Sequence, residues 1–242
     1  MMGIFEFFQT DTGTCPICHK VLFQKDKVVC SSCYELYLTK SLRSCQYCGR
    51  GLNEWEEETL CHQCGNGQNH YFDSGYSWIC YKDGGKILVL NMKFNGAKNL
   101  GIWMGKEMGV ELAQKQWIKE IDCIIPVPLY SKREKERGYN QSFLLAKGIQ
   151  MTLEMVGVSC PIENNTLIRH KNTDHQIGQT RNKRMENLKG AFCVEKTSNI
   201  KGKSILLVDD VLTTGSTLLE CATTAKQGGA KAVFVATATY RR

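Results

Sequence analysis

Four Cys-x-x-Cys pairs near the start of the chain constrain its fold more than any other feature. They are Cys15–Cys18, Cys30–Cys33, Cys45–Cys48 and Cys61–Cys64, with spacers of 11, 11 and 12 residues between successive pairs. In a reducing compartment, such a dense local pattern is typical of metal binding rather than of a disulfide framework. The repeat therefore predicts a small metal-stabilised unit whose folding energy comes largely from the metal.

Eight thiolates are enough for two closed tetrahedral zinc sites with four cysteines each. Such all-cysteine sites leave no open coordination position, so we expect structural Zn²⁺. Iron–sulfur clusters usually have other cysteine spacings, and a redox role needs only one pair. The sequence leaves open which two Cys-x-x-Cys pairs bind the same metal ion. The first pair shares its ion either with the second pair or, in an interleaved arrangement, with the third. One zinc with four spare cysteines is another alternative.

The charge balance and the composition of the chain both change near residue 66. Residues 1–66 carry six Lys/Arg against eight Asp/Glu, whereas residues 67–242 carry 25 against 16. A polar, glycine-containing stretch at 66–69 marks the boundary. We therefore predict a zinc-binding domain over 1–66 and a larger domain over 67–242. The basic balance of the larger domain favours phosphates, nucleotides or nucleic acid as partners.

The larger domain alternates apolar strand patterns with helical ones, which favours an α/β fold with a mostly parallel sheet flanked by helices. The stretch 87–90 fits either a helix or a strand. Strands are predicted over 71–81 (or a hairpin there), 122–127, 203–209 and 232–237, and helices over 97–119, 141–156 and 216–227.

No segment of the sequence has the pattern of a membrane span or of a secretory signal. The longest apolar runs are far too short to cross a bilayer. The first residues lack the basic region of a signal peptide. These observations predict a cytoplasmic protein. An apolar content of 42% also argues against disorder.

Residues 205–218 carry the chemistry of a phosphate site. Four apolar residues are followed by Asp209 and Asp210, and then by the turn Thr213-Thr214-Gly215-Ser216-Thr217, which opens a predicted helix. Such a turn offers backbone N–H groups, hydroxyls and a helix N-terminus to a phosphate. Two carboxylates beside it would repel the phosphate unless they hold ribose hydroxyls or Mg²⁺. The alternative is a solvated strand end with an N-cap.

This segment resembles the motif of type I phosphoribosyltransferases that binds 5-phosphoribosyl 1-pyrophosphate (PRPP). The order of motifs along the chain is similar to that of the ComF family of late-competence proteins. The resemblance runs from residue 15 to the C-terminus and rests on the four cysteine pairs, 125–129, 137–141, 167–192 and 205–218.

The resemblance implies a type I phosphoribosyltransferase fold behind a zinc-binding domain. Asp209 and Asp210 would hold the ribose hydroxyls, and residues 213–217 would hold the 5′-phosphate. Mg²⁺ would bind together with PRPP. Basic side chains would neutralise the diphosphate, and the candidates are Lys132, Arg133, Arg137, Arg181 and Arg184.

Three functions remain open at this point. The first is an active phosphoribosyltransferase, whose acceptor the sequence does not identify; Thr213 stands where 6-oxopurine salvage enzymes carry an acid. The second is an adaptor in DNA uptake during natural transformation. By the family resemblance, it would work with the competence helicase ComFA on single-stranded DNA at the inner face of the membrane. The third is a zinc-mediated docking module, which the retained acidic pair argues against.

Overall fold

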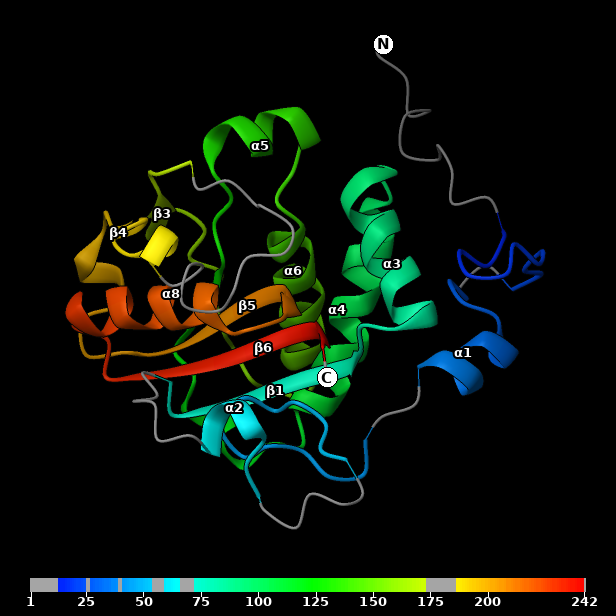
Figure 1. Ribbon diagram of the computed structural model, residues 1–242, viewed down its shortest axis with the longest axis horizontal. Coiled ribbons are helices and arrows are strands. Elements are labelled where there is room, and N and C mark those ends of the chain that lie inside the picture. Colours follow the sequence, from blue (N-terminus) through cyan, green and yellow to red (C-terminus); the bar gives the residue numbers. More distant parts are fainter. Residues whose placement is uncertain are drawn as a thin grey trace.

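The computed structural model describes residues 13–24, 27–38, 41–53, 59–65, 72–172 and 186–241. At its centre lies a parallel sheet of four strands in the order β1-β6-β5-β2 (Figure 1). Most residues of these strands are buried, as expected where both faces of a sheet are covered. The predicted α/β class is therefore confirmed. The strands are β1 (Ser74–Cys80), β2 (Cys123–Pro126), β5 (Ser204–Leu212) and β6 (Ala232–Tyr240).

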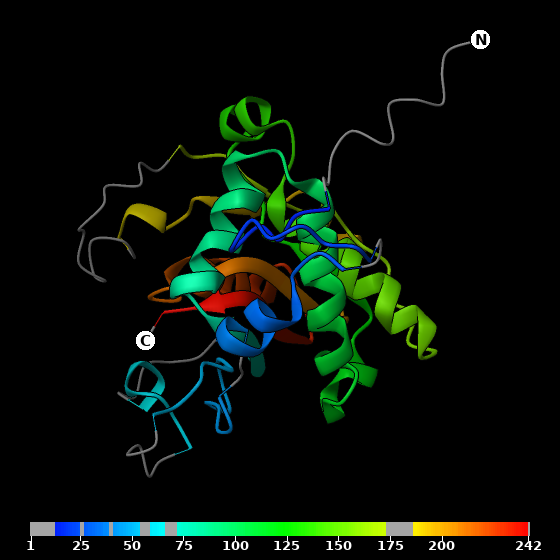
Figure 2. The same cartoon turned by 90° about the vertical axis from the view of Figure 1, so that its right-hand side faces the viewer.

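Helices cover both faces of the sheet (Figures 1 and 2). Alternate residues of β5 enter two separate cores, because successive side chains of a strand point to opposite faces. Leu206 and Val208 pack on the side of α3, α4 and α6, whereas Ile205 and Leu207 pack on the side of α8. The helices are α3 (Asp83–Phe94), α4 (Lys98–Leu112), α6 (Gln141–Met155) and α8 (Ser216–Gln227).

The helix expected over 97–119 is shorter than predicted. After α4 the chain forms a separate 3₁₀-helix, η2 (Gln116–Glu120). Trp117 in η2 stacks on Phe234 of β6 with ring centroids 4.8 Å apart, and Ile118 is buried. These contacts hold the chain against the sheet in a way that helical periodicity does not reveal. The ambiguous stretch 87–90 lies within α3.

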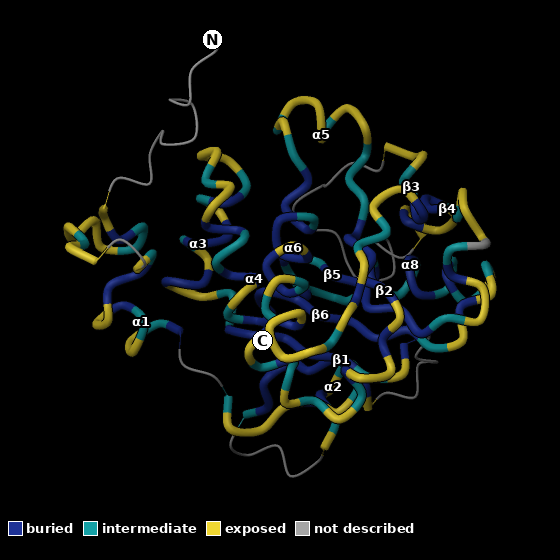
Figure 3. Tube along the Cα trace, turned by 180° about the vertical axis from the view of Figure 1, so that it is seen from behind, coloured by how far each residue is buried: buried dark blue, intermediate teal, exposed yellow. Residues whose placement is uncertain are grey.

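Smaller elements lie near α8 and near the segment that follows β2. The strands β3 (Leu167–Arg169) and β4 (Phe192–Val194) form an antiparallel pair beside α8, and η3 (Thr197–Asn199) follows β4. Helix α5 (Ser131–Arg137) stands after β2 and buries none of its residues, as the burial colouring in Figure 3 shows. Within the described ranges, no helix has the length and apolar character needed to span a bilayer.

The cysteine pairs form two groups, one from the first two pairs and one from the last two. Short helices accompany them, α1 (Ser31–Tyr37) and α2 (His62–Gly65). Both groups pack on the α/β unit: the Tyr34 hydroxyl donates to Glu107 of α4 at 2.6 Å, and the Ser77 hydroxyl of β1 donates to the Cys48 carbonyl at 3.0 Å. The predicted domain boundary at residue 66 lies outside the described residues.

The close packing of α4 on α6 depends on glycine. A Cβ atom on Gly148 would lie 2.1 Å from the Ile102 carbonyl oxygen and 2.7 Å from the Lys106 nitrogen, both in the backbone of α4. We expect Gly148→Val to lower the free energy of unfolding by about 1–3 kcal/mol or more, because the helices must separate. Thermal unfolding will measure this effect. Lys147→Ala, at an exposed neighbouring position, should leave stability nearly unchanged; similar losses in both variants would contradict the prediction.

Candidate functional site

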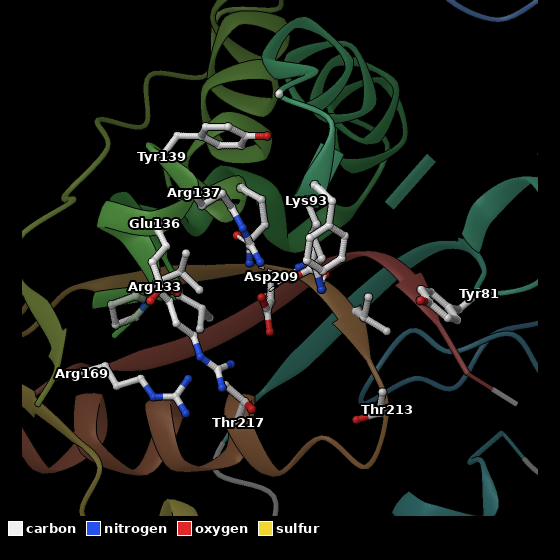
Figure 4. Close-up of a pocket in the computed structure, with 18 of the residues that line it drawn as sticks. Tyr81, Lys93, Arg133, Glu136, Arg137, Tyr139, Arg169, Asp209, Thr213 and Thr217 are labelled. Carbon is white, nitrogen blue, oxygen red and sulfur yellow. Dashed lines mark hydrogen bonds and ion pairs between the residues drawn. The ribbon is translucent and has the colours of Figure 1, made fainter. Parts of the chain in front are cut away.

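A cavity of about 690 Å³ opens at the carboxyl end of β5. This end of a parallel sheet is where ligands bind in open α/β folds. The cavity brings together six of the predicted site residues, which come from α5, from β5, from the turn after β5 and from the start of α8: Arg133, Arg137, Asp209, Asp210, Thr213 and Thr217. In Figure 4 the labelled side chains of Arg133, Arg137 and Arg169 approach the cavity from the side of α5 and β3, and Thr217 lies at the start of α8.

The two carboxylates of β5 are held by different partners. Asp209 accepts hydrogen bonds through Oδ1 from the Ser142 hydroxyl at 3.1 Å and from the Asp210 amide at 2.9 Å. Asp210 is buried, and its Oδ1 accepts from Gln141 Nε2 at 3.0 Å. Its other oxygen, Oδ2, forms an ion pair with the ammonium group of Lys93. The N-terminus of α6 and the C-terminal turn of α3 therefore orient the acidic pair.

These surroundings separate the pKa values of the two carboxyls. Burial raises the pKa of Asp209 to about 7, and the charge of Asp210 acts in the same direction. Burial also disfavours the charged form of Asp210, but the Lys93 ammonium and the Gln141 amide outweigh it and lower the pKa of Asp210. Near neutral pH, Asp210 is ionised, whereas Asp209 is close to the midpoint of its titration. A ligand cation or hydroxyl donor that arrives at Asp209 would favour its charged form.

The turn after β5 leads directly into α8. Gly215 has a φ of 77° and stands at the N-cap of that helix, a left-handed conformation that glycine adopts at no steric cost. The hydroxyls of Thr214 and Ser216 lie 2.8 Å apart within hydrogen-bonding distance. Thr213 and Thr217 line the cavity. The turn thus places hydroxyls and the N-terminus of a 12-residue helix beside the acidic pair.

The five predicted basic residues differ in their placement. Arg133 and Arg137 line the cavity, and Arg137 donates a hydrogen bond to the side-chain oxygen of Gln141. Lys132 is exposed on α5 and is not among the lining residues. Arg181 and Arg184 lie outside the described residues. Arg169 of β3 also lines the cavity.

Comparisons with known proteins agree with this geometry. A family model described as "Phosphoribosyl transferase domain" matches residues 144–242. Competence protein F of Haemophilus influenzae is 31% identical over 206 residues, which cover 81% of this chain and 85% of that protein. This chain belongs to the ComF family. Two further relatives are DNA utilization protein YhgH of Escherichia coli K12 (28% identical; 79% and 87% covered) and competence protein ComFC of Bacillus subtilis (29%; 72% and 68%).

Membership of the ComF family and the domain match confirm the predicted fold, a phosphoribosyltransferase-like parallel sheet with a cysteine-rich segment before it. The matched region includes β5, the turn and α8, which supply the acidic pair and the predicted phosphate loop. It starts within α6, so the cysteine pairs, α3 and α5 lie outside the match.

The ComF-family chain also carries two candidate metal centres. The Sγ atoms of Cys15, Cys18, Cys30 and Cys33, and likewise those of Cys45, Cys48, Cys61 and Cys64, all lie within 4.8 Å of one another. The Cys18–Cys30 and Cys48–Cys61 sulfur pairs are each 3.7 Å apart. A tetrahedral zinc site with Zn–S bonds of about 2.3 Å has sulfur–sulfur edges of about 3.8 Å. Both groups therefore fit zinc, and the interleaved pairing is not adopted.

Three residues that orient the acidic pair are not among the predicted site residues. Lys93 belongs to none of the motifs and is separated from Asp210 by more than a hundred residues of sequence. Ser142 stands just after the motif at 137–141, and its role depends on the first turn of α6 facing β5. Gln141 belongs to that motif, which was the one available signal for it.

Proposed function

We propose that this ComF-family protein binds PRPP together with Mg²⁺ in the cavity at the end of β5 and acts in competence-related DNA uptake. One observation carries the first part: the acidic pair, Arg133 and Arg137 line one cavity together with Thr213 and Thr217, the first and last residues of the predicted loop. The names of the relatives, competence protein and DNA utilization protein, support the second part.

In this proposal each part of PRPP has a partner. Asp209 and Asp210 accept hydrogen bonds from the ribose 2′- and 3′-hydroxyls. The 5′-phosphate binds to the backbone N–H groups and hydroxyls of 213–217, where the dipole of α8 also favours negative charge. Arg133 and Arg137 pair with the diphosphate. Mg²⁺, when bound, neutralises the diphosphate and stabilises it as a leaving group.

Transfer to an acceptor follows from this placement. The acceptor nucleophile forms a bond to the anomeric carbon while the bond from that carbon to the diphosphate oxygen breaks, and pyrophosphate leaves with the electron pair. The transition state resembles a ribosyl cation. Asp209 and Asp210 hold the ribose in position, and the arginines stabilise the charge on the departing diphosphate.

Calorimetric titration of the folded, zinc-loaded protein with PRPP tests the proposal. We expect saturable binding with Mg²⁺ and weaker binding without it. Ribose 5-phosphate should bind more weakly than PRPP, because it lacks the diphosphate that Arg133 and Arg137 contact. The absence of any binding to protein that is folded and carries its metal would contradict the proposal.

A second candidate is an adaptor that retains this site but acts on DNA. The basic balance of residues 67–242 favours it. Its partners would be single-stranded DNA and the competence helicase ComFA, which would place the protein on the cytoplasmic side of the membrane. Fluorescence anisotropy with a single-stranded oligonucleotide should show binding that weakens steeply between low and physiological salt. Binding that Asp209→Asn leaves unchanged would separate the adaptor function from PRPP binding.

The raised pKa of Asp209 predicts a pH dependence. The ionised carboxylate is the stronger acceptor for the ribose hydroxyls, so affinity for Mg²⁺–PRPP should rise as the pH rises through about 7. For a group with this pKa, the ionised fraction increases about tenfold between pH 6 and pH 8. PRPP itself titrates in this range, so the control is Asp209→Asn, which should show a shallower pH profile. Equal profiles for the two proteins would contradict the prediction.

A further inference from the structure

The two groups of cysteines contain the same turn twice. In the first turn, the Cys15 amide donates to the Lys20 carbonyl and the His19 amide to the Cys15 carbonyl, each at 2.8 Å. In the second, Cys45 has the same two bonds, at the same length, with Arg50 and Gly49. The φ angles match as well, 60° at His19 and 70° at Gly49. Lys20 and Arg50 therefore occupy equivalent positions in the two turns.

The two basic side chains have different surroundings. Lys20 is exposed, whereas Arg50 is only 7% exposed. Arg50 is buried because the second turn packs tightly on β1. A Cβ atom on Gly49 would lie 2.3 Å from the Tyr76 Cα atom, so glycine is required for this approach.

Arg50 joins the second cysteine group to the predicted phosphate loop. One of its terminal guanidinium nitrogens donates to the Gln63 side-chain oxygen at 3.0 Å and to the Thr213 carbonyl at 2.5 Å. Gln63 lies between Cys61 and Cys64, and Thr213 lines the cavity. The backbone carbonyl of Arg50 accepts from the Cys45 amide, and its buried side chain joins the Cys61–Cys64 turn to the first residue of the loop.

We propose that Arg50 is a positioning residue for the phosphate loop and that, through it, the second cysteine group controls the loop's geometry. The peptide bond between Thr213 and Thr214 is trans, so its carbonyl and its N–H point in opposite directions. By holding the carbonyl toward the cysteines, Arg50 directs the Thr214 N–H away from them. The effect of Arg50 on ligand binding rests on the proposed function, in which the loop amides bind the 5′-phosphate.

Hydrogen exchange of the loop amides, measured without ligand, tests the inference. We expect Arg50→Gln to speed exchange at residues 213–217 by about tenfold, equivalent to about 1.4 kcal/mol, because the loop loses a hydrogen bond from a charged donor. Lys20→Gln, the same change at the equivalent exposed position, should leave loop exchange unchanged. Arg50→Lys retains the charge but not the guanidinium, and its exchange should be intermediate. All three variants should keep the metal content of the wild type.

Several outcomes would overturn the inference. One is that Arg50→Gln keeps its metal and its loop amides exchange at the wild-type rate. Another is that Lys20→Gln speeds loop exchange as much as Arg50→Gln does. If Arg50→Gln loses its metal or its fold, loop exchange is measured in Arg50→Lys instead. Exchange at the wild-type rate in that variant refutes the inference. In a wild type that binds PRPP, Arg50→Gln should weaken binding by about tenfold. A wild type that does not bind PRPP would refute the proposed function, while the exchange experiment would still decide the role of Arg50.

Discussion

Asp209→Asn should weaken the binding of Mg²⁺–PRPP by about a hundredfold, or about 2.8 kcal/mol, and leave the folded protein no less stable. The loss in binding follows because an amide is a weaker acceptor for ribose hydroxyls and provides no charge for a cation. The stability is retained because asparagine keeps the oxygen that accepts hydrogen bonds from Ser142 and from the Asp210 amide.

The pKa of Asp209 determines how this variant behaves at different pH values. Because the pKa in the folded protein is raised to about 7, the folded state binds more protons than the unfolded state below that pH. The contribution of Asp209 to wild-type stability therefore falls as the pH rises from about 4 through 7. Asp209→Asn removes this loss, so its melting temperature at pH 8 should equal or exceed that of the wild type.

Titration calorimetry and thermal unfolding at pH 8 measure the two effects. Glu136→Gln is the matched control, since it removes a carboxylate from the exposed rim of the same cavity. It should leave binding unchanged or slightly tighter, because a negative charge near the diphosphate is lost. Asp210→Asn is the poorer variant, since it leaves the Lys93 ammonium without its carboxylate partner. Wild-type affinity in Asp209→Asn would contradict the proposed role of this carboxylate.

The parts of the site that lie close together in sequence could be predicted from it. The acidic pair, the turn and the start of α8 lie within one short segment, so strand, turn and helix signals place them together without tertiary information. The helix over 216–227 was predicted with its observed bounds. The strand over 203–209 was predicted too short, because Val211 and Leu212 continue the pairing with β6 beyond the acidic pair.

The contacts that orient the site could not be predicted. Lys93 reaches Asp210 because α3 packs across one face of the sheet, and Arg50 reaches Thr213 because a glycine turn lies against β1. Neither lysine nor arginine has a local pattern that reveals a distant buried partner. The cysteine pairing was open for the same reason: the spacing fixes which residues share a turn, but not which turns meet.

Removal of one ligand from the second cysteine group should unfold that part of the chain. Structural zinc sites contribute about 10–16 kcal/mol of apparent binding energy to folding, as much as the total stability of most domains. We expect Cys45→Ser to lower the metal content from two zinc ions per chain to one, as counted by native mass spectrometry. Residues 41–53 and 59–65 should then become sensitive to protease.

Cys193→Ser is the control for the substitution itself, because Cys193 belongs to neither group and is partly exposed on β4. It should retain two zinc ions and wild-type protease resistance. Because Arg50 binds the Thr213 carbonyl from within the second group, Cys45→Ser should also speed hydrogen exchange in the phosphate loop. Cys15→Ser, in the first group, should lose one zinc ion with a smaller effect on that loop. If Cys45→Ser retained two zinc ions, or lost both, the result would contradict the presence of two independent metal centres.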